Sequence, residues 1–97
     1  MGMYKLSEAA TEDLRELYHY GVLNFGLRVA DAYYDGLIVR FEDIAEHPEL
    51  YQAVDSIRSG YRRTVCGVHS IYYHVVDEGV IIMRILRSQN PGTALPE

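Results

Sequence analysis

Three strand-like segments follow one another in the second half of the chain, and they constrain its fold more than any other feature. Residues 61–66, 70–76 and 80–86 are rich in β-branched and aromatic side chains. The connections between them, 67–69 and 77–79, are short and contain glycine, which favours hairpin loops. The pattern therefore predicts an antiparallel meander.

Two amphipathic helical segments precede these strands. Ser7 is placed to cap a first helix over about residues 8–24, and Gly26 is placed to end it. The second helical segment ends at His47-Pro48, because the residue before proline avoids the helical conformation. The link is so short that the helices should form an antiparallel hairpin. The apolar face is expected to comprise Ala10, Leu14, Leu17, Gly21 and Phe25 in the first helix and Ala30, Tyr34, Leu37, Phe41 and Ile44 in the second.

The fold predicted from these segments is α+β. Tyr4 to Ser7 alternates between apolar and polar residues and is interpreted as a short first strand. A helical hairpin is then expected to pack on a mostly antiparallel four-stranded sheet, in the order β-α-α-β-β-β. Residues 1–97 form one domain, since a chain of this size has room for one modest core. Residues 88–97 contain two prolines and no periodicity, which predicts an irregular tail.

The distribution of charge narrows the class of partner. The net charge of −5 argues against binding nucleic acid through bulk electrostatics, because such affinity depends on Lys and Arg displacing counterions. We therefore expect no direct sequence-specific binding of nucleic acid. The acidic residues are concentrated in the helical half, and a local basic face on an acidic protein suits a specific partner. The arginines of the strand half are Arg58, Arg62, Arg63, Arg84 and Arg87.

Several other classes of function are disfavoured. The apolar runs fall far short of the roughly 18 to 20 residues that a membrane-spanning helix needs, and the N-terminus lacks a signal-peptide pattern, so a cytoplasmic location without membrane association is expected. The single cysteine, Cys66, cannot form an internal disulfide, which agrees with a reducing compartment. The histidines lack the spacing of metal ligands, and no phosphate-binding loop or nucleophile elbow is present. We expect no metal, no cofactor and no enzymatic activity. The four histidines are His19, His47, His69 and His74.

A series of short motifs runs in order along most of the chain. The motifs are Tyr4-x-Leu6-Ser7, Asp13-Leu14, Phe25-Gly26, Ala45-Glu46-His47-Pro48, Ile57-Arg58-x-Gly60-Tyr61-Arg62-Arg63, Gly67-x-His69-x-Ile71-x-Tyr73 and Arg84-Ile85-Leu86. Their order and spacing resemble the ParE branch of the RelE/ParE toxin superfamily, small bacterial proteins encoded beside an antitoxin. This resemblance implies the toxin component of a type II toxin–antitoxin system. It further implies a ParD-like antitoxin as one partner and DNA gyrase as the other, with gyrase inhibited by binding and not by a catalysed reaction.

The resemblance also suggests which residues meet each partner. The five arginines of the strand half are the candidates for contact with gyrase. For the antitoxin we expect an amphipathic segment that folds onto exposed apolar surface of the helical hairpin and the sheet edge, and so forms a hetero-oligomer. The candidate residues for that contact are Tyr18, Tyr33, Leu37 and Tyr51.

Two alternatives remain open at this level. The first is a RelE-like ribosome-dependent messenger-RNA endonuclease, suggested by Arg62, Arg63, Arg84 and Tyr72 on neighbouring strands. The acidic net charge favours the ParE branch over this alternative. The second is a detoxified member that only binds antitoxin. It is suggested by the sequence of residues 87–91, where ParE relatives often have a histidine followed by a Met-Asp pair.

Overall fold

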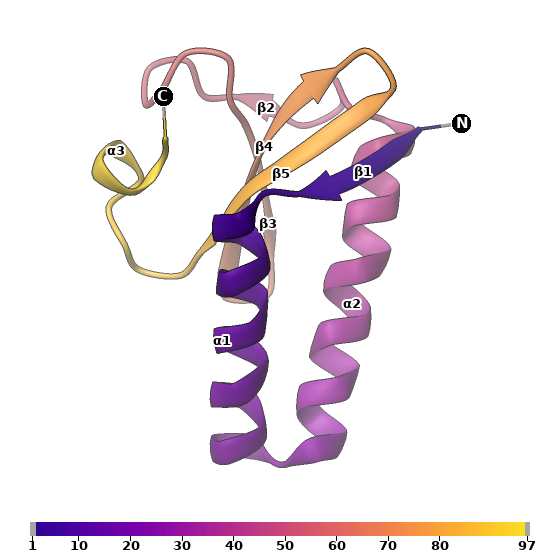
Figure 1. Cartoon of the computed structure of the whole chain (residues 1–97), viewed down its shortest axis with the longest axis vertical. Helices are drawn as coiled ribbons and strands as arrows, with labels where there is room; N and C mark the ends of the chain where they lie inside the picture. Colours follow the sequence, from indigo (N-terminus) through magenta and orange to yellow (C-terminus); the bar gives the residue numbers. More distant parts are fainter. Residues whose placement is uncertain (1, 97) are drawn as a thin grey trace.

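Two long helices and a five-stranded sheet make up most of the structure, a computed structural model that describes residues 2–96 (Figure 1). The elements, in chain order, are β1 (Met3–Leu6), α1 (Glu8–Phe25), α2 (Leu27–Glu46), β2 (Gln52–Ala53), β3 (Arg62–Cys66), β4 (His69–Val76), β5 (Gly79–Leu86) and α3 (Pro91–Ala94). The predicted α+β class and the succession of one strand, two helices and three strands are confirmed.

The sheet has the strand order β1-β5-β4-β3-β2. Strands β3, β4 and β5 form the predicted antiparallel meander. At one edge β1 pairs in parallel with β5, with Tyr4 opposite Val80, and at the other edge β2 pairs with β3 in the antiparallel sense. The prediction of four strands missed β2, because a two-residue strand is too short to show a periodic pattern.

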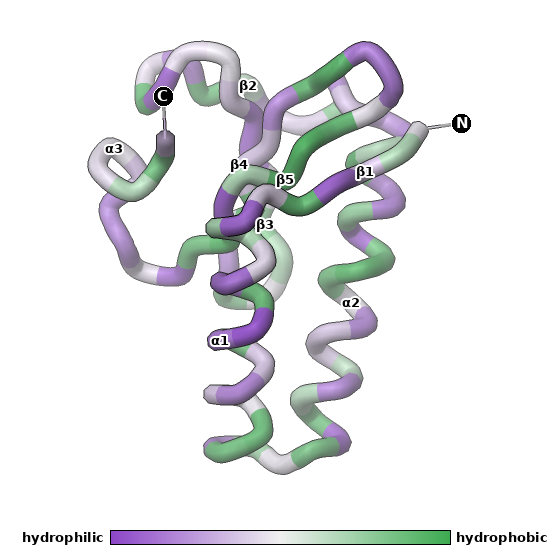
Figure 2. Tube along the Cα trace, viewed as in Figure 1, coloured by the Kyte–Doolittle hydropathy of each residue, from purple (hydrophilic) through white to green (hydrophobic). Residues whose placement is uncertain are grey.

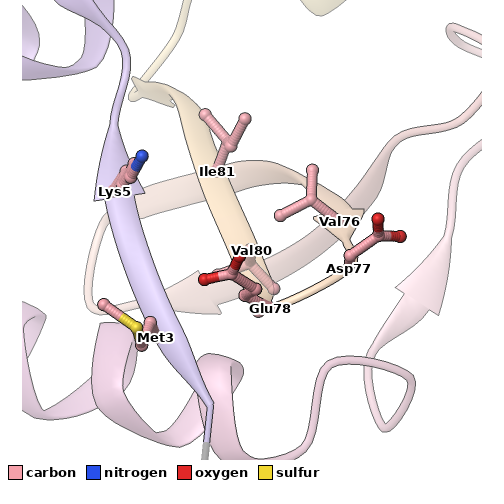
Figure 3. Close-up of a pocket in the computed structure, with 8 residues that line it drawn as sticks. Met3, Lys5, Val76, Asp77, Glu78, Val80 and Ile81 are labelled. Atoms are coloured by element: carbon pink, nitrogen blue, oxygen red, sulfur yellow. The ribbon is translucent and has the colours of Figure 1, made fainter.

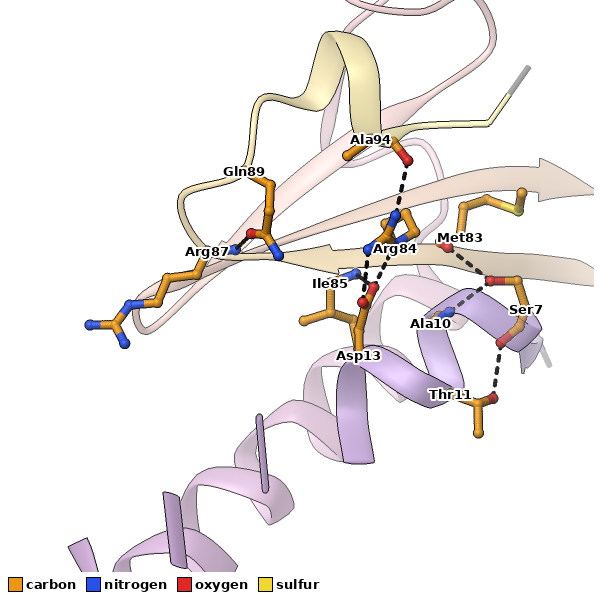
Figure 4. Close-up of polar contacts among 10 residues, drawn as sticks. All are labelled: Ser7, Ala10, Thr11, Asp13, Met83, Arg84, Ile85, Arg87, Gln89 and Ala94. Carbon is orange, nitrogen blue, oxygen red and sulfur yellow. Dashed lines mark hydrogen bonds and ion pairs between the residues drawn. The ribbon is translucent and has the colours of Figure 1, made fainter. Parts of the chain in front are cut away.

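Local capping interactions place both long helices. Ser7 is the N-cap of α1, as predicted, and its hydroxyl accepts a hydrogen bond from the Ala10 amide at 3.0 Å. The same hydroxyl donates to the Met83 carbonyl at 2.8 Å, which joins the start of α1 to β5 (Figure 4). Gly26 separates the two helices with φ of +89°, a backbone conformation that is costly for residues other than glycine. These contacts make the helices an antiparallel hairpin beside the sheet.

The main core lies between the helical hairpin and one face of the sheet. The predicted apolar face of α2 is confirmed, since Tyr34 packs against the core as a partly buried residue and the other four positions are buried. Ala10 and Leu14 of α1 are buried as predicted. The sheet contributes Ile71, Tyr73, Val80, Ile82 and Ile85 to this core.

The helical hairpin extends beyond the sheet, and this overturns one prediction. Helix α1 has 18 residues and is therefore about 27 Å long. The joined ends of α1 and α2 project away from the strands, and apolar residues lie at their tip (Figures 1 and 2). Phe25, predicted to face the core, is 62% exposed because no strand reaches that far. The end of the hairpin is thus left as an exposed apolar surface.

The C-terminal tail covers part of the other face of the sheet, which we call the outer face. The prediction of an irregular segment over residues 88–97 is wrong for α3, a single helical turn capped by the Asn90 side chain, and Glu97 lies outside the described residues. Leu95 is 2% exposed and packs in a second apolar cluster. One turn is too short to produce a helical pattern, and the apolar surface that receives Leu95 exists only once the sheet has formed. The cluster comprises Val54, Tyr61, Tyr72, Leu86 and Leu95.

Candidate functional site

An apolar cavity opens where the helical hairpin leaves the sheet. It has a volume of about 260 Å³ and lies between α1, α2 and the turn that joins β3 to β4. Gly21 and Ala30 lie at the helix crossing, where a Cβ atom on Gly21 would lie only 3.3 Å from the Ala30 side chain. We call this cavity, together with its rim, the hairpin groove. Its lining includes Tyr18, Tyr20, Phe25, Val29, Tyr33 and Val68.

Exposed apolar side chains extend this groove along the tip of the hairpin. Leu23 is 72% exposed and Leu27 is 60% exposed, and they flank Phe25 in the chain. Val29 and Val68 are exposed as well. Large exposed apolar patches on a small protein mark surfaces that meet a partner. The hairpin groove therefore has the composition of a docking site for an apolar face.

Tyr33 fixes one wall of the groove. Its hydroxyl accepts a hydrogen bond from the Val68 amide at 3.1 Å, and it lies 3.0 Å from the Cys66 carbonyl and 2.7 Å from His69 Nδ1. Burial is the main cause that raises the pKa of Tyr33, so its hydroxyl stays protonated and able to donate. Gly67 lies against the Tyr33 ring with φ of +62°. The β3–β4 turn is thereby held against α2.

The groove has a polar end at His69 and Arg87. The Arg87 guanidinium lies 6.0 Å from the centre of the Tyr20 ring, in a cation–π geometry. Burial, and then the nearby Arg87 charge, lowers the pKa of His69 below its ordinary value of 6.5. The imidazole is therefore neutral at pH 7. The groove thus offers an apolar floor with one cationic group at its end.

Two of the four residues predicted to meet an antitoxin line this groove. Tyr18 and Tyr33 do so, and the Tyr18 hydroxyl donates to the Asp31 carboxylate at 2.5 Å, a bond that raises the pKa of Tyr18. Leu37 is 0% exposed and belongs to the core, so its choice as a surface residue is wrong. Tyr51 is half-buried outside the groove lining and donates to the Asp43 carboxylate.

The five arginines of the strand half do not share one surface, contrary to expectation. Arg62 is opposite Tyr73, whose side chain faces the helices, and it donates to the Tyr51 carbonyl at 2.7 Å. Arg63 is opposite Tyr72, which faces outward. Successive residues of a strand point to opposite faces, so adjacent arginines of one strand are necessarily separated.

Two more of these arginines hold parts of the chain together. Arg84 forms a bidentate ion pair with Asp13 and donates to the Ala94 carbonyl (Figure 4). The bond to Asp13 is the main cause that raises the pKa of Arg84. Arg58 donates to the Gly92 carbonyl at 2.5 Å. Both guanidinium groups are therefore occupied with the chain's own groups in this conformation.

The residues that suggested a ribonuclease are brought together only in part: Arg63, Tyr72 and Arg84 are in register on neighbouring strands, whereas Arg62 faces the helices. Tyr72 is 3% exposed beneath the outer apolar cluster. Arg62 lies on the helix side of the sheet, and Arg84 is paired with Asp13. Among residues 2–96, no three His, Cys, Asp or Glu side chains converge closely enough to hold a metal ion.

A second cavity of about 260 Å³ lies on the outer face beside the β1 edge (Figure 3). Met3, Val76 and Ile81 contribute apolar side chains to it, and Lys5 contributes an amine. The Asp77 carboxylate points away from Lys5 in Figure 3. No set of reactive groups converges there within the described part of the chain, so we assign no chemistry to this cavity.

Most of the groove was missed by the sequence analysis. Tyr20, Val29 and Val68 were not among the predicted residues, and Phe25 was placed in the core. Element length gave no signal, because the eight-residue strands β4 and β5 are each about 26 Å long and the 18-residue helix α1 is about 27 Å long. The apolar end of the hairpin is exposed because the hairpin is offset from the sheet and projects past it (Figure 1).

Within residues 2–96, neither long helix is apolar enough over a sufficient length to cross a membrane.

Comparison with known proteins identifies the family. Residues 4–91 match the family described as the ParE toxin of the type II toxin–antitoxin system parDE. The chain is 36% identical over 90 residues to Toxin ParE1 of Caulobacter vibrioides, covering 93% of this chain and 94% of the relative. It is 33% identical over 87 residues to Toxin ParE1 of Mycobacterium tuberculosis, with 89% of both chains covered.

A solved structure shows the same fold at lower sequence identity. A chain of the chromosomal ParDE toxin–antitoxin system from P. aeruginosa superposes with a TM-score of 0.78 and 20% identity, covering 92% of this chain and 98% of that chain. The family match spans nearly the whole sequence, and the relatives are matched over almost their full length. The chain therefore belongs to the ParE toxin family of type II toxin–antitoxin systems.

Proposed function

We propose that this chain is the toxin of a ParDE-type pair, that a ParD-like antitoxin neutralises it by binding, and that it inhibits DNA gyrase in the cytoplasm by binding and without catalysing a reaction. Family membership supports the toxin role. The name of the P. aeruginosa system, in which a ParE chain is paired with ParD, supports an antitoxin partner. The apolar hairpin groove is the structural observation that carries the antitoxin part of the proposal.

An amphipathic antitoxin segment fits the hairpin groove. Such a segment gains free energy by placing apolar side chains on Phe25 and Val29 and in the cavity beside Tyr33. Burial of apolar area offsets the entropy lost when a disordered segment becomes ordered. Because Tyr33 already holds the β3–β4 turn against α2, this wall of the groove is formed before the partner arrives. The antitoxin would then cover surface that is otherwise exposed to water.

Binding of the ParD-like protein encoded beside this chain tests the antitoxin part. Phe25→Ser and Val29→Ser each remove exposed apolar surface from the groove. Each should weaken binding and so raise the dissociation constant, measured by calorimetry, by about tenfold or more. Val39→Ser is the matched control, since Val39 is 63% exposed on α2 but does not line the groove. Equal affinity for all three variants and the original chain would contradict docking in the groove.

A supercoiling assay with purified gyrase tests the target. Addition of the chain should inhibit supercoiling, and addition of the antitoxin should restore it. Arg63 and Arg87 are the arginines best placed to contact the target, since Arg87 is exposed and Arg63 has no hydrogen-bond or ion-pair partner among the described residues. Arg63→Gln and Arg87→Gln should weaken inhibition, whereas the conservative change Arg87→Lys should weaken it less.

Growth of cells that express the chain separates the remaining alternatives. An active toxin should arrest growth with a DNA-damage response. Harmless expression combined with tight antitoxin binding would instead identify a detoxified member. Ribosome-dependent cleavage of messenger RNA would replace the gyrase proposal with the ribonuclease alternative.

A further inference from the structure

The Tyr33 hydroxyl has three neighbours at hydrogen-bond distance, and together they fix where the protons lie. The Val68 amide donates to it at 3.1 Å, and it donates its single proton to the Cys66 carbonyl at 3.0 Å. Since a hydroxyl has one proton and two lone pairs, the third neighbour, His69 Nδ1 at 2.7 Å, also donates to it. His69 is neutral at pH 7, so its one ring proton is on Nδ1 and Nε2 carries a lone pair.

His69 Nε2 is free to accept a hydrogen bond from another molecule. The two nitrogens of an imidazole point in divergent directions, so Nε2 points away from Tyr33. It has no hydrogen-bond partner among residues 2–96, and it is not buried. His69 lines the cavity of the hairpin groove and also an adjoining cavity of about 220 Å³. A partner that fills the groove therefore meets a hydrogen-bond acceptor at this position.

Arg87 places a hydrogen-bond donor beside this acceptor. It lines the same two cavities as His69, and its charge acts on the imidazole. The side chain of Arg87 points away from the ion pair of Asp13 and Arg84 (Figure 4) and lies over the Tyr20 ring. Within the described part of the chain the guanidinium forms no hydrogen bond or ion pair. A cationic donor and a neutral acceptor thus lie together at the end of an apolar groove.

We propose that His69 and Arg87 recognise the side-chain amide of an asparagine or glutamine at the end of the apolar face of the docked antitoxin segment. The amide carbonyl accepts from the Arg87 guanidinium, and the amide nitrogen donates to His69 Nε2. A carboxylate would accept from Arg87 but would face the lone pair of Nε2, and a lysine would be repelled by the Arg87 charge. This recognition rests on the proposed binding of a ParD-like antitoxin in the hairpin groove, and it adds the polar group that the partner carries.

The position of the ring proton is measured on the free chain. Heteronuclear NMR of the histidine rings shows which nitrogen is protonated, and at pH 8 His69 should carry its proton on Nδ1. Tyr33→Phe removes the hydroxyl that accepts this bond and should lower the share of this tautomer. A proton on Nε2 in the original chain would overturn the proposal, since no acceptor would then face the partner.

Two substitutions of His69 separate recognition of the partner from a structural role. His69→Asn keeps a donor near the position of Nδ1 and removes Nε2, whereas His69→Gln keeps an acceptor near the position of Nε2 and loses the bond to Tyr33. Calorimetry with the ParD-like protein encoded beside this chain should show affinity about fivefold to tenfold lower for His69→Asn, and a smaller loss for His69→Gln. If His69 only held Tyr33 in place, the order of the two variants would be reversed, and the proposal would fail.

His19 provides the matched control for these substitutions. It is an exposed histidine of α1 that lines neither cavity, so His19→Asn should leave antitoxin binding unchanged. A loss equal to that of His69→Asn would show that the effect is not specific to the groove and would overturn the proposal.

Double-mutant cycles identify the side chain of the partner. Each polar residue of the antitoxin segment is replaced in turn by alanine and tested against the original chain, His69→Asn and Arg87→Gln. An asparagine or glutamine should show a loss of several-fold that shrinks when His69 or Arg87 is already changed. Coupling to an aspartate, a glutamate or a hydroxyl residue instead, or to none, would overturn the assignment to an amide.

Acid tests the same assignment through the sign of its effect. Protonation of His69 at Nε2 removes the acceptor, so the ratio of the affinity of the original chain to that of His69→Gln should fall from pH 8 to pH 5. A carboxylate partner would make this ratio rise, which would overturn the proposal. Both chains retain the other charged or titratable groups around His69, so the ratio isolates its contribution. These groups are Asp13, Glu16, Tyr33, Cys66 and Arg87.

Failure of the amide assignment is distinguishable from failure of the proposed function. If Phe25→Ser weakens antitoxin binding and His69→Asn does not, docking in the hairpin groove stands and the amide assignment fails. If Phe25→Ser has no effect, docking in the groove fails and the amide assignment fails with it.

Discussion

Asp13 of α1 and Arg84 of β5 are joined by two hydrogen bonds, from Nε to Oδ2 at 2.7 Å and from Nη2 to Oδ1 at 2.9 Å. Oδ2 of Asp13 also accepts a bond from the Ile85 amide at 2.9 Å, and Arg84 Nη1 reaches the Ala94 carbonyl. One buried carboxylate therefore ties α1 to β5 beyond the point where β1 ends, and through Arg84 to the tail (Figure 4).

Removal of this carboxylate should destabilise the fold strongly. Asp13→Ala leaves the Arg84 guanidinium and the Ile85 amide without their acceptor, and breaking a buried ion pair in this way costs about 3 kcal/mol of unfolding free energy. Urea denaturation measures the loss. Glu42→Ala, at an exposed position of α2, is the control and should change stability by less than about 0.5 kcal/mol. If Asp13→Ala loses no more unfolding free energy than the control, the ion pair contributes little to the stability of the fold.

Gly67 and Gly60 form a matched pair of turn glycines. Both have positive φ, +62° and +84°, but a Cβ atom would lie 2.6 Å from the Tyr33 ring at Gly67 and would meet nothing within 4 Å at Gly60. Gly60→Ala should cost about 1 to 2 kcal/mol of unfolding free energy from backbone strain alone. Gly67→Ala should cost more, because Tyr33 must also move. Thermal and urea unfolding compare the two variants. Equal losses of unfolding free energy would mean that Tyr33 moves away from the new methyl group at no cost.

Tyr73 makes the stability of the protein sensitive to alkali. Burial raises its pKa to about 12 from the ordinary value of 10.0, and its hydroxyl donates to the Pro48 carbonyl at 2.8 Å. In the unfolded chain the phenol loses its proton near pH 10, so between pH 10 and 12 the folded state binds more protons and stability falls as pH rises. Tyr73→Phe should make the fall in unfolding free energy from pH 9 to pH 11 shallower. An unchanged slope would contradict this assignment.

His69 and His74 should make the protein sensitive to acid. Burial lowers the pKa of both histidines below 6.5, and Arg87 contributes at His69. Below pH 6.5 the unfolded chain binds more protons than the folded one, so their contribution to stability is complete above pH 6.5 and is lost as pH falls. His69→Gln should flatten the pH dependence of unfolding free energy below 6.5. The unfolding free energy of the same variant at pH 8 provides the reference. If the unfolding free energies of the variant and of the original chain fall in parallel below pH 6.5, the role of His69 is refuted.

Features that depend on neighbouring residues in the chain were predictable. The Ser7 cap, the Gly26 break and the three strands of the meander involve residues close in sequence, and the structure confirms each of them. The order of these segments and the motifs on them also indicated the ParE family, which the comparisons show. Short strands and single helical turns escaped prediction because β2 and α3 are too brief to carry a periodic pattern.

The sequence by itself determined the two long helices, the four longer strands, their order along the chain and the family. Only the tertiary structure decided which surfaces remain for partners. Phe25 is exposed because the end of α1 projects past the sheet (Figure 1). Arg62, and not Arg63, lies on the helix side because Tyr73 opposite it belongs to the main core. Arg84 is occupied because Asp13 reaches it from a helix 71 residues earlier in the chain. These outcomes depend on how packed elements are placed relative to one another and on pairings between distant residues. Periodicity within one segment contains no information about either.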